Sequence, residues 1–179
     1  HGPKEKPRVG VCVCGQMERL ALESKLRHLV EPNRDAFDFD VVMVLSRDAA
    51  AFAIPEQDAG GRATWTTRSL DEAMATRNLT YTINDAPQWD APYAVPHYAS
   101  MITHHLHPVN QTLIAEKQVK QWFQLFRCWE ALAVRNSVVD GVCQRPYDLL
   151  LKVREDTVFY EETNLTTLLL DTTRTTEQQ

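Results

Sequence analysis

The chain lacks the features that would place it in a membrane or on nucleic acid. No apolar stretch among its 179 residues approaches the roughly 18–20 residues that cross a bilayer, and no secretory signal segment opens the chain. The formal net charge is −5, so no positive field exists to hold a nucleic-acid backbone. We therefore expect no nucleic-acid partner, and membrane attachment only through an N-terminal anchor removed ahead of residue 1.

Several common catalytic signatures are also missing. The first strand is followed by Gly15 and Gln16 rather than by a Gly-x-Gly-x-x-Gly fingerprint, which argues against a dinucleotide-binding domain. The sequence has no Gly-x-Ser-x-Gly elbow and no P-loop lysine, which argues against an α/β-hydrolase and against a P-loop nucleotide-binding protein.

The four cysteines form no Cys-x-x-Cys pair. Cys12 and Cys14 are two apart in a β-branched run and should share one face of a strand, Cys128 falls in a helical pattern and Cys143 in a loop. We expect Cys12 and Cys14 to be buried, unmodified thiols, since free cysteine is among the most buried residue types.

A histidine-rich segment offers an alternative metal site. Imidazole is a common zinc ligand, but no cysteine or glutamate spacing accompanies these histidines. They are His97, His104, His105 and His107.

Three Asn-x-Ser/Thr sequons would accept N-linked glycans in a secretory compartment and mean nothing in the cytosol. They favour a glycoprotein of the Golgi lumen or a secreted one, with the cytoplasm left open. They begin at Asn78, Asn110 and Asn164.

The composition, 44% hydrophobic and 24% charged, is typical of a globular chain. We expect one α/β domain over residues 4–170. Residues 1–3 resemble the remnant of a cleaved tag, and residues 171–179 are expected to fray.

Apolar patterning predicts strands, helices and long loops in alternation. Short β-branched or continuous apolar runs predict strands over residues 8–14, 41–45, 78–83 and 148–153. Helical spacing predicts helices over residues 16–30, 69–77 and 114–136, the second opened by a Ser69–Glu72 capping box.

This alternation predicts a Rossmann-like three-layer sandwich around a mostly parallel sheet. We expect the first, second and fourth strands to be neighbours. An aromatic stripe on the long helix should pack on this sheet, and it comprises Val119, Trp122, Phe123, Phe126, Trp129 and Ala133.

The segment YDLLLKVREDTVFYEE, residues 147–162, places Arg154 and Asp156 just after an apolar strand. Ligands collect beyond the carboxyl ends of parallel strands, where Gly15, Gln16, and Ser46 with Asp48 are also expected. An arginine fork suits a diphosphate and a carboxylate suits a divalent cation. A surface ion pair at a strand end is the other interpretation.

Three pieces of the sequence, VGVCVCGQMERL, QVKQWFQLFRCWEAL and YDLLLKVREDTVF, together resemble the N-terminal half of a glycosyltransferase domain of the GT-A type. The resemblance implies that Arg154 approaches a nucleotide-sugar diphosphate, and that Asp156 binds the ribose or a Mn²⁺ or Mg²⁺ ion. Gly15, Gln16 and Arg19 would match the nucleotide-binding turn.

Asp156 is followed by Thr157 and Val158, so the second acidic residue of an Asp-x-Asp motif is missing, and no acceptor-binding segment is evident between Leu170 and residue 179. Two functions therefore stay open. One is sugar transfer from a nucleotide-sugar donor to an unidentified acceptor hydroxyl, with an unassigned catalytic base. The other is a non-catalytic binding module on the same sheet. For either function, we expect Arg154 and Asp156 to face the same cleft as Gly15 and Gln16 at the carboxyl edge of the sheet. Residues i and i+2 of an extended segment share a face, so Glu155 should turn away.

Overall fold

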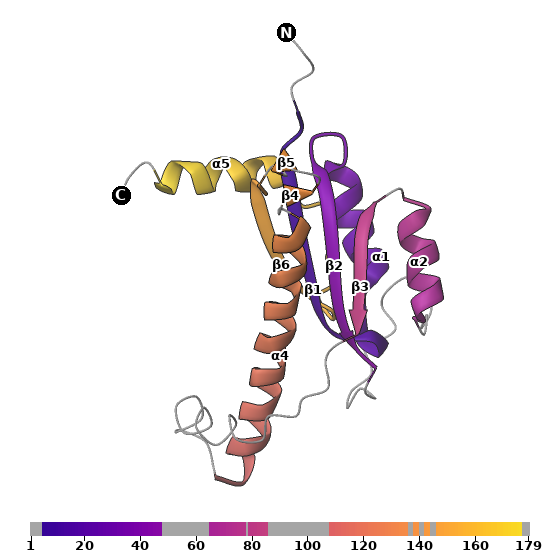
Figure 1. Ribbon diagram of the computed structural model, residues 1–179, viewed down its shortest axis with the longest axis vertical. Coiled ribbons are helices and arrows are strands. Elements are labelled where there is room, and N and C mark those ends of the chain that lie inside the picture. The colour runs from indigo at the N-terminus through magenta and orange to yellow at the C-terminus, as the bar shows by residue number, and fades with distance from the viewer. Residues whose placement is uncertain are drawn as a thin grey trace.

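A computed structural model describes residues 5–47, 65–77, 79–85, 108–135, 138–139, 142–143 and 146–176. Strands and helices alternate along these residues (Figure 1). The strands are β1 (Arg8–Gln16), β2 (Asp38–Ser46), β3 (Thr80–Asp85), β4 (Val138–Val139), β5 (Val142–Cys143) and β6 (Leu149–Arg154). The helical segments are η1 (Met17–Arg19), α1 (Leu22–Lys25), η2 (Leu26–Val30), η3 (Glu31–Asn33), α2 (Thr67–Ala75), α4 (Pro108–Arg135) and α5 (Leu165–Thr176).

The main sheet has four strands in the order β3-β2-β1-β6, and every neighbouring pair is parallel. This arrangement confirms the expected α/β class and the expected neighbours of β1. The two faces of β1 and β2 are covered, which explains why both strands are continuous apolar runs. The short β4 and β5 form a separate antiparallel pair.

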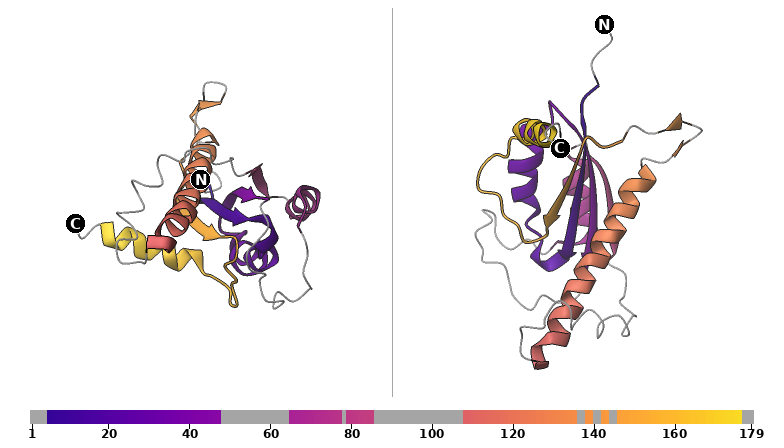
Figure 2. Two further views of the ribbon diagram at one scale, coloured as in Figure 1. Left: turned by 90° about the horizontal axis from the view of Figure 1, so that it is seen from below. Right: turned by 90° about the vertical axis from the view of Figure 1, so that its left-hand side faces the viewer.

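Helices cover both faces of this sheet (Figure 2). The crossovers from β1 to β2 and from β2 to β3 move in one direction across the sheet, whereas the connection from β3 to β6 moves back past β2 and β1. Parallel crossovers are almost always right-handed, so a reversed direction places the connecting helix on the opposite face. Accordingly, α1, η2, α2 and α5 pack on one face and α4 packs on the other.

The larger core lies on the first face, between odd-numbered strand residues and the apolar sides of the helices. Its fully buried side chains include Val9, Leu22, Leu26, Met43, Leu45, Leu70, Met74 and Leu165. Burial of one such side chain contributes roughly 1.5–3 kcal/mol, so this face supplies most of the hydrophobic stabilisation.

The expected stripe on α4 is confirmed at Val119, which is buried, and at Trp129, which packs on the core between α4 and the sheet, but it is wrong at its exposed members. Trp122 and Phe126 are 53% and 54% exposed, whereas Cys128 and Leu132 are buried against β1 and β2. Small side chains let the helix approach the sheet closely. Gly10 helps, because a Cβ there would lie 3.4 Å from Leu132.

The boundaries of two helices also differ from the expected ones. The 16–30 segment begins as a 3-10 turn, and its α-helix starts only at Leu22. The helix α2 is capped by Thr66, whose side chain and that of Ser69 form a reciprocal capping box. Glu72 instead pairs with Arg68 one turn earlier, at 2.9 Å.

An ion cluster closes the amino edge of the sheet, and we call it the amino-edge cluster (Arg8, Asp40, Tyr147 and Asp148). Arg8 donates to Asp40 Oδ2 at 2.7 Å and lies over the Tyr147 ring at 4.5 Å, and the Tyr147 hydroxyl donates to the same oxygen at 2.9 Å. The Arg8 amide donates to the Asp148 carboxylate at 2.8 Å. These contacts join β1, β2 and the start of β6, so they fix the register of the three strands.

Part of the sequence reasoning falls on residues outside the described ones, namely Asp48, Asn78 and the four histidines of the 97–107 segment. Within the described residues, every helix is too short or too polar to span a bilayer.

Candidate functional site

The candidate site lies at the carboxyl edge of the sheet, where the arrowheads of β1, β2 and β3 end together (Figure 1). In the register of the sheet, Cys14 lies opposite Arg154, and Gln16 lies opposite Ser46. The chain leaves β1 towards β2 on one side and returns as β6 on the other. Such a reversal of strand order is where ligands bind in open parallel sheets.

Gly15 is the last residue but one of β1 and stands just before the 3-10 turn that begins at Met17. Its φ is 146°, which side chains with a Cβ rarely adopt. A Cβ at this position would also lie 2.0 Å from Cδ and Oε2 of Glu155. Both the backbone conformation and the space therefore require glycine here.

Asp156 is held between two guanidinium groups, and this is the central contact of the site. Arg154 donates from Nε to Oδ1 and from Nη2 to Oδ2, both at 3.0 Å. Arg19 donates from Nη2 to the same Oδ2. The structure thus brings Arg19, Arg154 and Asp156 together beside Gly15.

Glu155 does not turn away from Gly15, as the sequence led us to expect. It is 5% exposed, and its carboxyl group lies against Gly15 and 3.9 Å from Nη1 of Arg19. Its amide donates to the Cys14 carbonyl at 3.2 Å. The alternation of faces holds only within a strand, and β6 ends at Arg154, so Glu155 belongs to a turn.

Lys25 is a second residue that the sequence reasoning missed. Its side chain is buried, and its ammonium group donates to the carbonyls of Glu155 and Thr157 at 2.7 Å and of Ala21 at 3.1 Å. These bonds attach the segment after β6 to α1. The available signal was its spacing, because Lys25 falls on the same helix face as Leu22 and Leu29.

We call these residues the carboxyl-edge cluster (Arg19, Lys25, Arg154, Glu155 and Asp156). Its two arginines contact the two carboxylates, while Lys25 donates to backbone carbonyls. Counted together, three cationic side chains stand against two anionic ones in a chain whose net charge is −5. Arg154 is 52% exposed and Arg19 24% exposed along their side chains. The surplus therefore reaches the surface.

Gln16 and Ser46 lie at the same edge of the sheet, at the ends of β1 and β2. Beyond them, Arg47 pairs with Asp85 at 3.0 Å across the ends of β2 and β3. Both partners are exposed, and such pairs contribute little to stability.

A divalent cation does not fit the carboxyl-edge cluster as it is arranged. A Mn²⁺ or Mg²⁺ ion needs carboxylate oxygens, but both oxygens of Asp156 already accept from guanidinium groups. Glu155 is buried against Gly15 with Arg19 beside it. An ion at Asp156 would have to displace two arginines.

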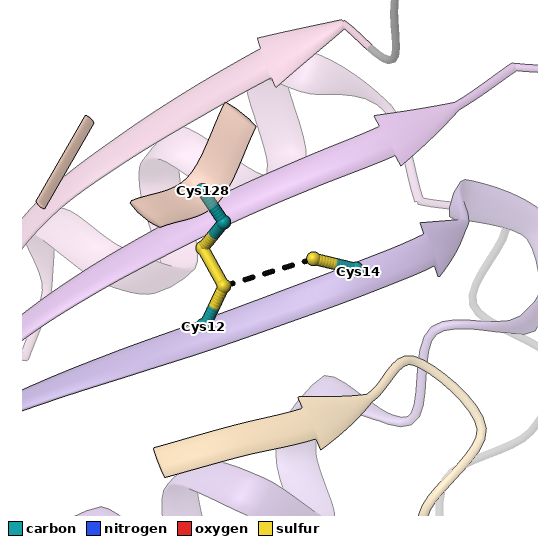
Figure 3. Close-up of side chains that lie close together, drawn as sticks. All are labelled: Cys12, Cys14 and Cys128. Atoms are coloured by element: carbon teal, nitrogen blue, oxygen red, sulfur yellow. Dashed lines mark hydrogen bonds between the residues drawn. A yellow bond between two sulfur atoms is a disulfide. The ribbon is translucent and has the colours of Figure 1, made fainter. Parts of the chain in front are cut away.

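A second cluster lies between β1 and α4, where Figure 3 shows Cys12, Cys14 and Cys128 converging. Cys12 and Cys128 are joined by a disulfide, so the expectation that Cys12 is unmodified is wrong. The pairing links residues 116 positions apart in sequence, which local spacing could not reveal. Cys14 is buried and free, as expected.

The three sulfurs lie within 4.8 Å of one another, but the disulfide uses two of them and leaves Cys14 as one thiol ligand. Cys14 Sγ lies 3.7 Å from Cys12 Sγ. Burial raises the pKa of the Cys14 thiol to about 12; the charge of Lys152 lowers it and that of Glu155 raises it. The thiol is therefore neutral and unreactive near pH 7.

No family model matches the chain, and searches among curated proteins and among solved structures found no match either. The functional argument therefore depends on the arrangement of the residues themselves.

Proposed function

We propose that this protein binds a nucleotide-sugar through its diphosphate at the carboxyl edge of the sheet, as a Rossmann-like domain of the GT-A glycosyltransferase type. The observation that carries the proposal is the position of the carboxyl-edge cluster. Two arginine forks stand beside a glycine turn at the one point where the strand order reverses. Reversal points in parallel sheets are general nucleotide-binding places.

Each residue of the site has a proposed role. Arg154 and Arg19 would bind the diphosphate oxygens, because a guanidinium group matches a pair of such oxygens. Gly15 lets the backbone of the turn approach the ligand closely. Gln16 and Ser46, at the ends of β1 and β2, would lie towards the nucleoside.

The proposed reaction is sugar transfer. The bond between the anomeric carbon and the diphosphate oxygen breaks, and that oxygen keeps the electron pair. The acceptor hydroxyl oxygen forms the new bond to the anomeric carbon and gives up its proton to a base that we leave unassigned. Arg154 and Arg19 would stabilise the charge that develops on the departing diphosphate.

A non-catalytic nucleotide-sugar-binding module is the second candidate. It is favoured by the state of Glu155 and Asp156, since both acidic side chains of the site are engaged with Arg19. A catalytic base has to reach the proton of the acceptor hydroxyl. Within the described part of the chain, these two carboxylates are not placed for that role.

We further propose that the protein folds in a secretory compartment such as the Golgi lumen. Disulfides persist mainly in oxidising compartments, and Cys12 is bonded to Cys128. Asn164 is exposed, although the next residue of its sequon, Leu165, is buried. The Asn164 Oδ1 accepts from the Thr167 amide, which leaves the side-chain nitrogen as the point of glycan attachment. Expression in secreting cells should give a product whose electrophoretic mobility changes on glycosidase treatment, and Asn164→Gln should remove part of that change.

Thermal denaturation with UDP, GDP and their sugar conjugates tests the binding function. A ligand that binds only the native state raises the melting temperature, and 100-fold excess over Kd adds about 2.7 kcal/mol. We expect one nucleotide series to stabilise the wild type more than Arg154→Lys, whose affinity should be about tenfold lower. Arg68→Gln, which removes a cation from an exposed pair on α2, is the matched control. Sugar release or transfer with the stabilising donor then separates the enzyme from the binding module.

A further inference from the structure

The contacts of Asp156 resemble those that a bound anion would make. A carboxylate and a phosphate each present two oxygens that a guanidinium fork binds in the same bidentate way. Arg154 binds both oxygens of Asp156, and Arg19 binds one of them. The side chain of Asp156 therefore occupies the position at which two arginines would hold an external anion.

The surroundings favour an anion over a cation at this place. Arg19, Arg154 and Lys25 together exceed the two carboxylates in charge. A divalent cation would meet three like charges within the cluster, whereas a diphosphate would neutralise the surplus. The repulsion of a cation and the attraction of an anion both become stronger with burial. The side chains of Asp156 and Arg19 are only 19% and 24% exposed.

We propose that Arg19 and Arg154 form a diphosphate site that works without a divalent cation, and that Asp156 is the internal counter-anion that a ligand displaces. The inference rests on the proposed function for the identity of the ligand. Arg154 is half exposed and can follow an incoming anion. Glu155 remains 3.9 Å from Nη1 of Arg19 and keeps that side chain at the site during the exchange.

Asp156 is thus a positioning residue with a second effect, because it competes with the ligand for the two arginines. Substitution of Asp156 changes the affinity for a diphosphate in opposite directions in the two roles that this residue could have. If Asp156 is a counter-anion, Asp156→Asn removes the competitor and tightens diphosphate binding. If Asp156 is a metal ligand, the same change weakens binding and abolishes its dependence on cations.

The experiment is titration calorimetry with inorganic pyrophosphate, UDP and GDP, each in a chelator and again with Mn²⁺. We expect pyrophosphate and one nucleotide to bind in the chelator, and Asp156→Asn to tighten binding about fivefold, the effect of one unit charge at about 4 Å in a watery site. Arg154→Lys and Arg19→Gln should each weaken it about tenfold. Arg68→Gln should match the wild type. Melting temperatures verify that each variant is folded.

Three other outcomes are informative. Nucleotide binding that requires Mn²⁺ and is lost in Asp156→Asn would overturn the inference and leave the proposed function standing. If pyrophosphate binds, the two arginine variants weaken that binding, and no nucleotide binds, the result would support the inference and overturn the proposed function. Absence of both would overturn both.

Discussion

The strand pair β1–β6 carries an ion cluster at each end, and the two clusters have opposite charge. At the amino edge, one arginine serves two carboxylates and lies over a tyrosine ring. At the carboxyl edge, two arginines contact two carboxylates and Lys25 adds a third cation that is bonded to backbone carbonyls. The first arrangement satisfies its cation completely within the protein, whereas the second leaves positive charge for an external partner.

The two edges also differ in what their backbones do. At the amino edge the strands are held in register by side chains from β1, β2 and the start of β6. At the carboxyl edge the chain turns at a left-handed glycine and at the Glu155–Asp156 turn. Arginines and carboxylates thus hold the strands in register where the strands begin, and they form a candidate binding site where the strands end.

The largest expected effect is at Gly15. Gly15→Ala should reduce the free energy of unfolding by about 3–5 kcal/mol, because it combines an unfavourable φ with overpacking against Glu155. Urea denaturation measures the loss. Gly10→Ala is the control, since its Cβ would meet the flexible end of Leu150 at 2.7 Å, and it should cost less. Equal losses in the two variants would show that the turn is not specially constrained.

The disulfide is the next largest contribution, and it should support both edges equally because it lies between them. Reduction should lower the free energy of unfolding by about 2–4 kcal/mol through the larger entropy of the open unfolded chain. Urea curves with and without a phosphine reductant give the difference. The curves of Cys128→Ala should not respond to the reductant, and a response would mean that Cys12 has another partner.

The amino edge should behave as a structural clasp. Asp40→Asn should cost about 2 kcal/mol of stability, because it weakens the charged hydrogen bonds from Arg8 and Tyr147. Pyrophosphate affinity should stay at the wild-type value. A loss of pyrophosphate affinity without a loss of stability would contradict this prediction, because it would place the binding site at the amino edge.

The smallest effect concerns Cys14. Its folded pKa of about 12 exceeds the ordinary value of 9.0, so the folded state holds the proton more tightly. The resulting stability is fully present below pH 9 and is lost as the pH rises towards 12. Between pH 8 and pH 10 the wild type should lose about 1 kcal/mol more than Cys14→Ala. Equal pH dependence in the two proteins would indicate an exposed thiol.

Sequence patterning predicted the parts of the fold that depend on periodicity. The apolar runs that became β1 and β2 are buried on both faces, which is typical of a parallel sheet, and the expected neighbours of β1 were β2 and the half-buried edge strand β6. Arg19, Arg154 and Asp156 could be assigned to one edge because they follow strands that end there. Whether they bind a nucleotide-sugar stays a prediction.

The remaining features depend on contacts that no local pattern contains. The rotation of α4 is set by the close approach of Cys128 and Leu132 to the sheet, and hydrophobicity alone favoured its larger aromatic residues. Glu155 faces Gly15 because β6 ends at Arg154, and sequence patterning does not locate the end of a strand to within one residue. The three bonds of Lys25 reach carbonyls up to 132 positions away.

The link between Cys12 and Cys128 also determines how the molecule would respond to mechanical force. When the chain is pulled from its two ends, tension passes directly through the bond, and the 116 positions between the cysteines carry none. Of the 179 residues, roughly 60 can then extend, to a contour length of about 220 Å against about 640 Å after reduction, at about 3.6 Å per residue. The last part of β1, all of β2 and β3, and most of α4 would thus be shielded from stretching for as long as the bond is intact.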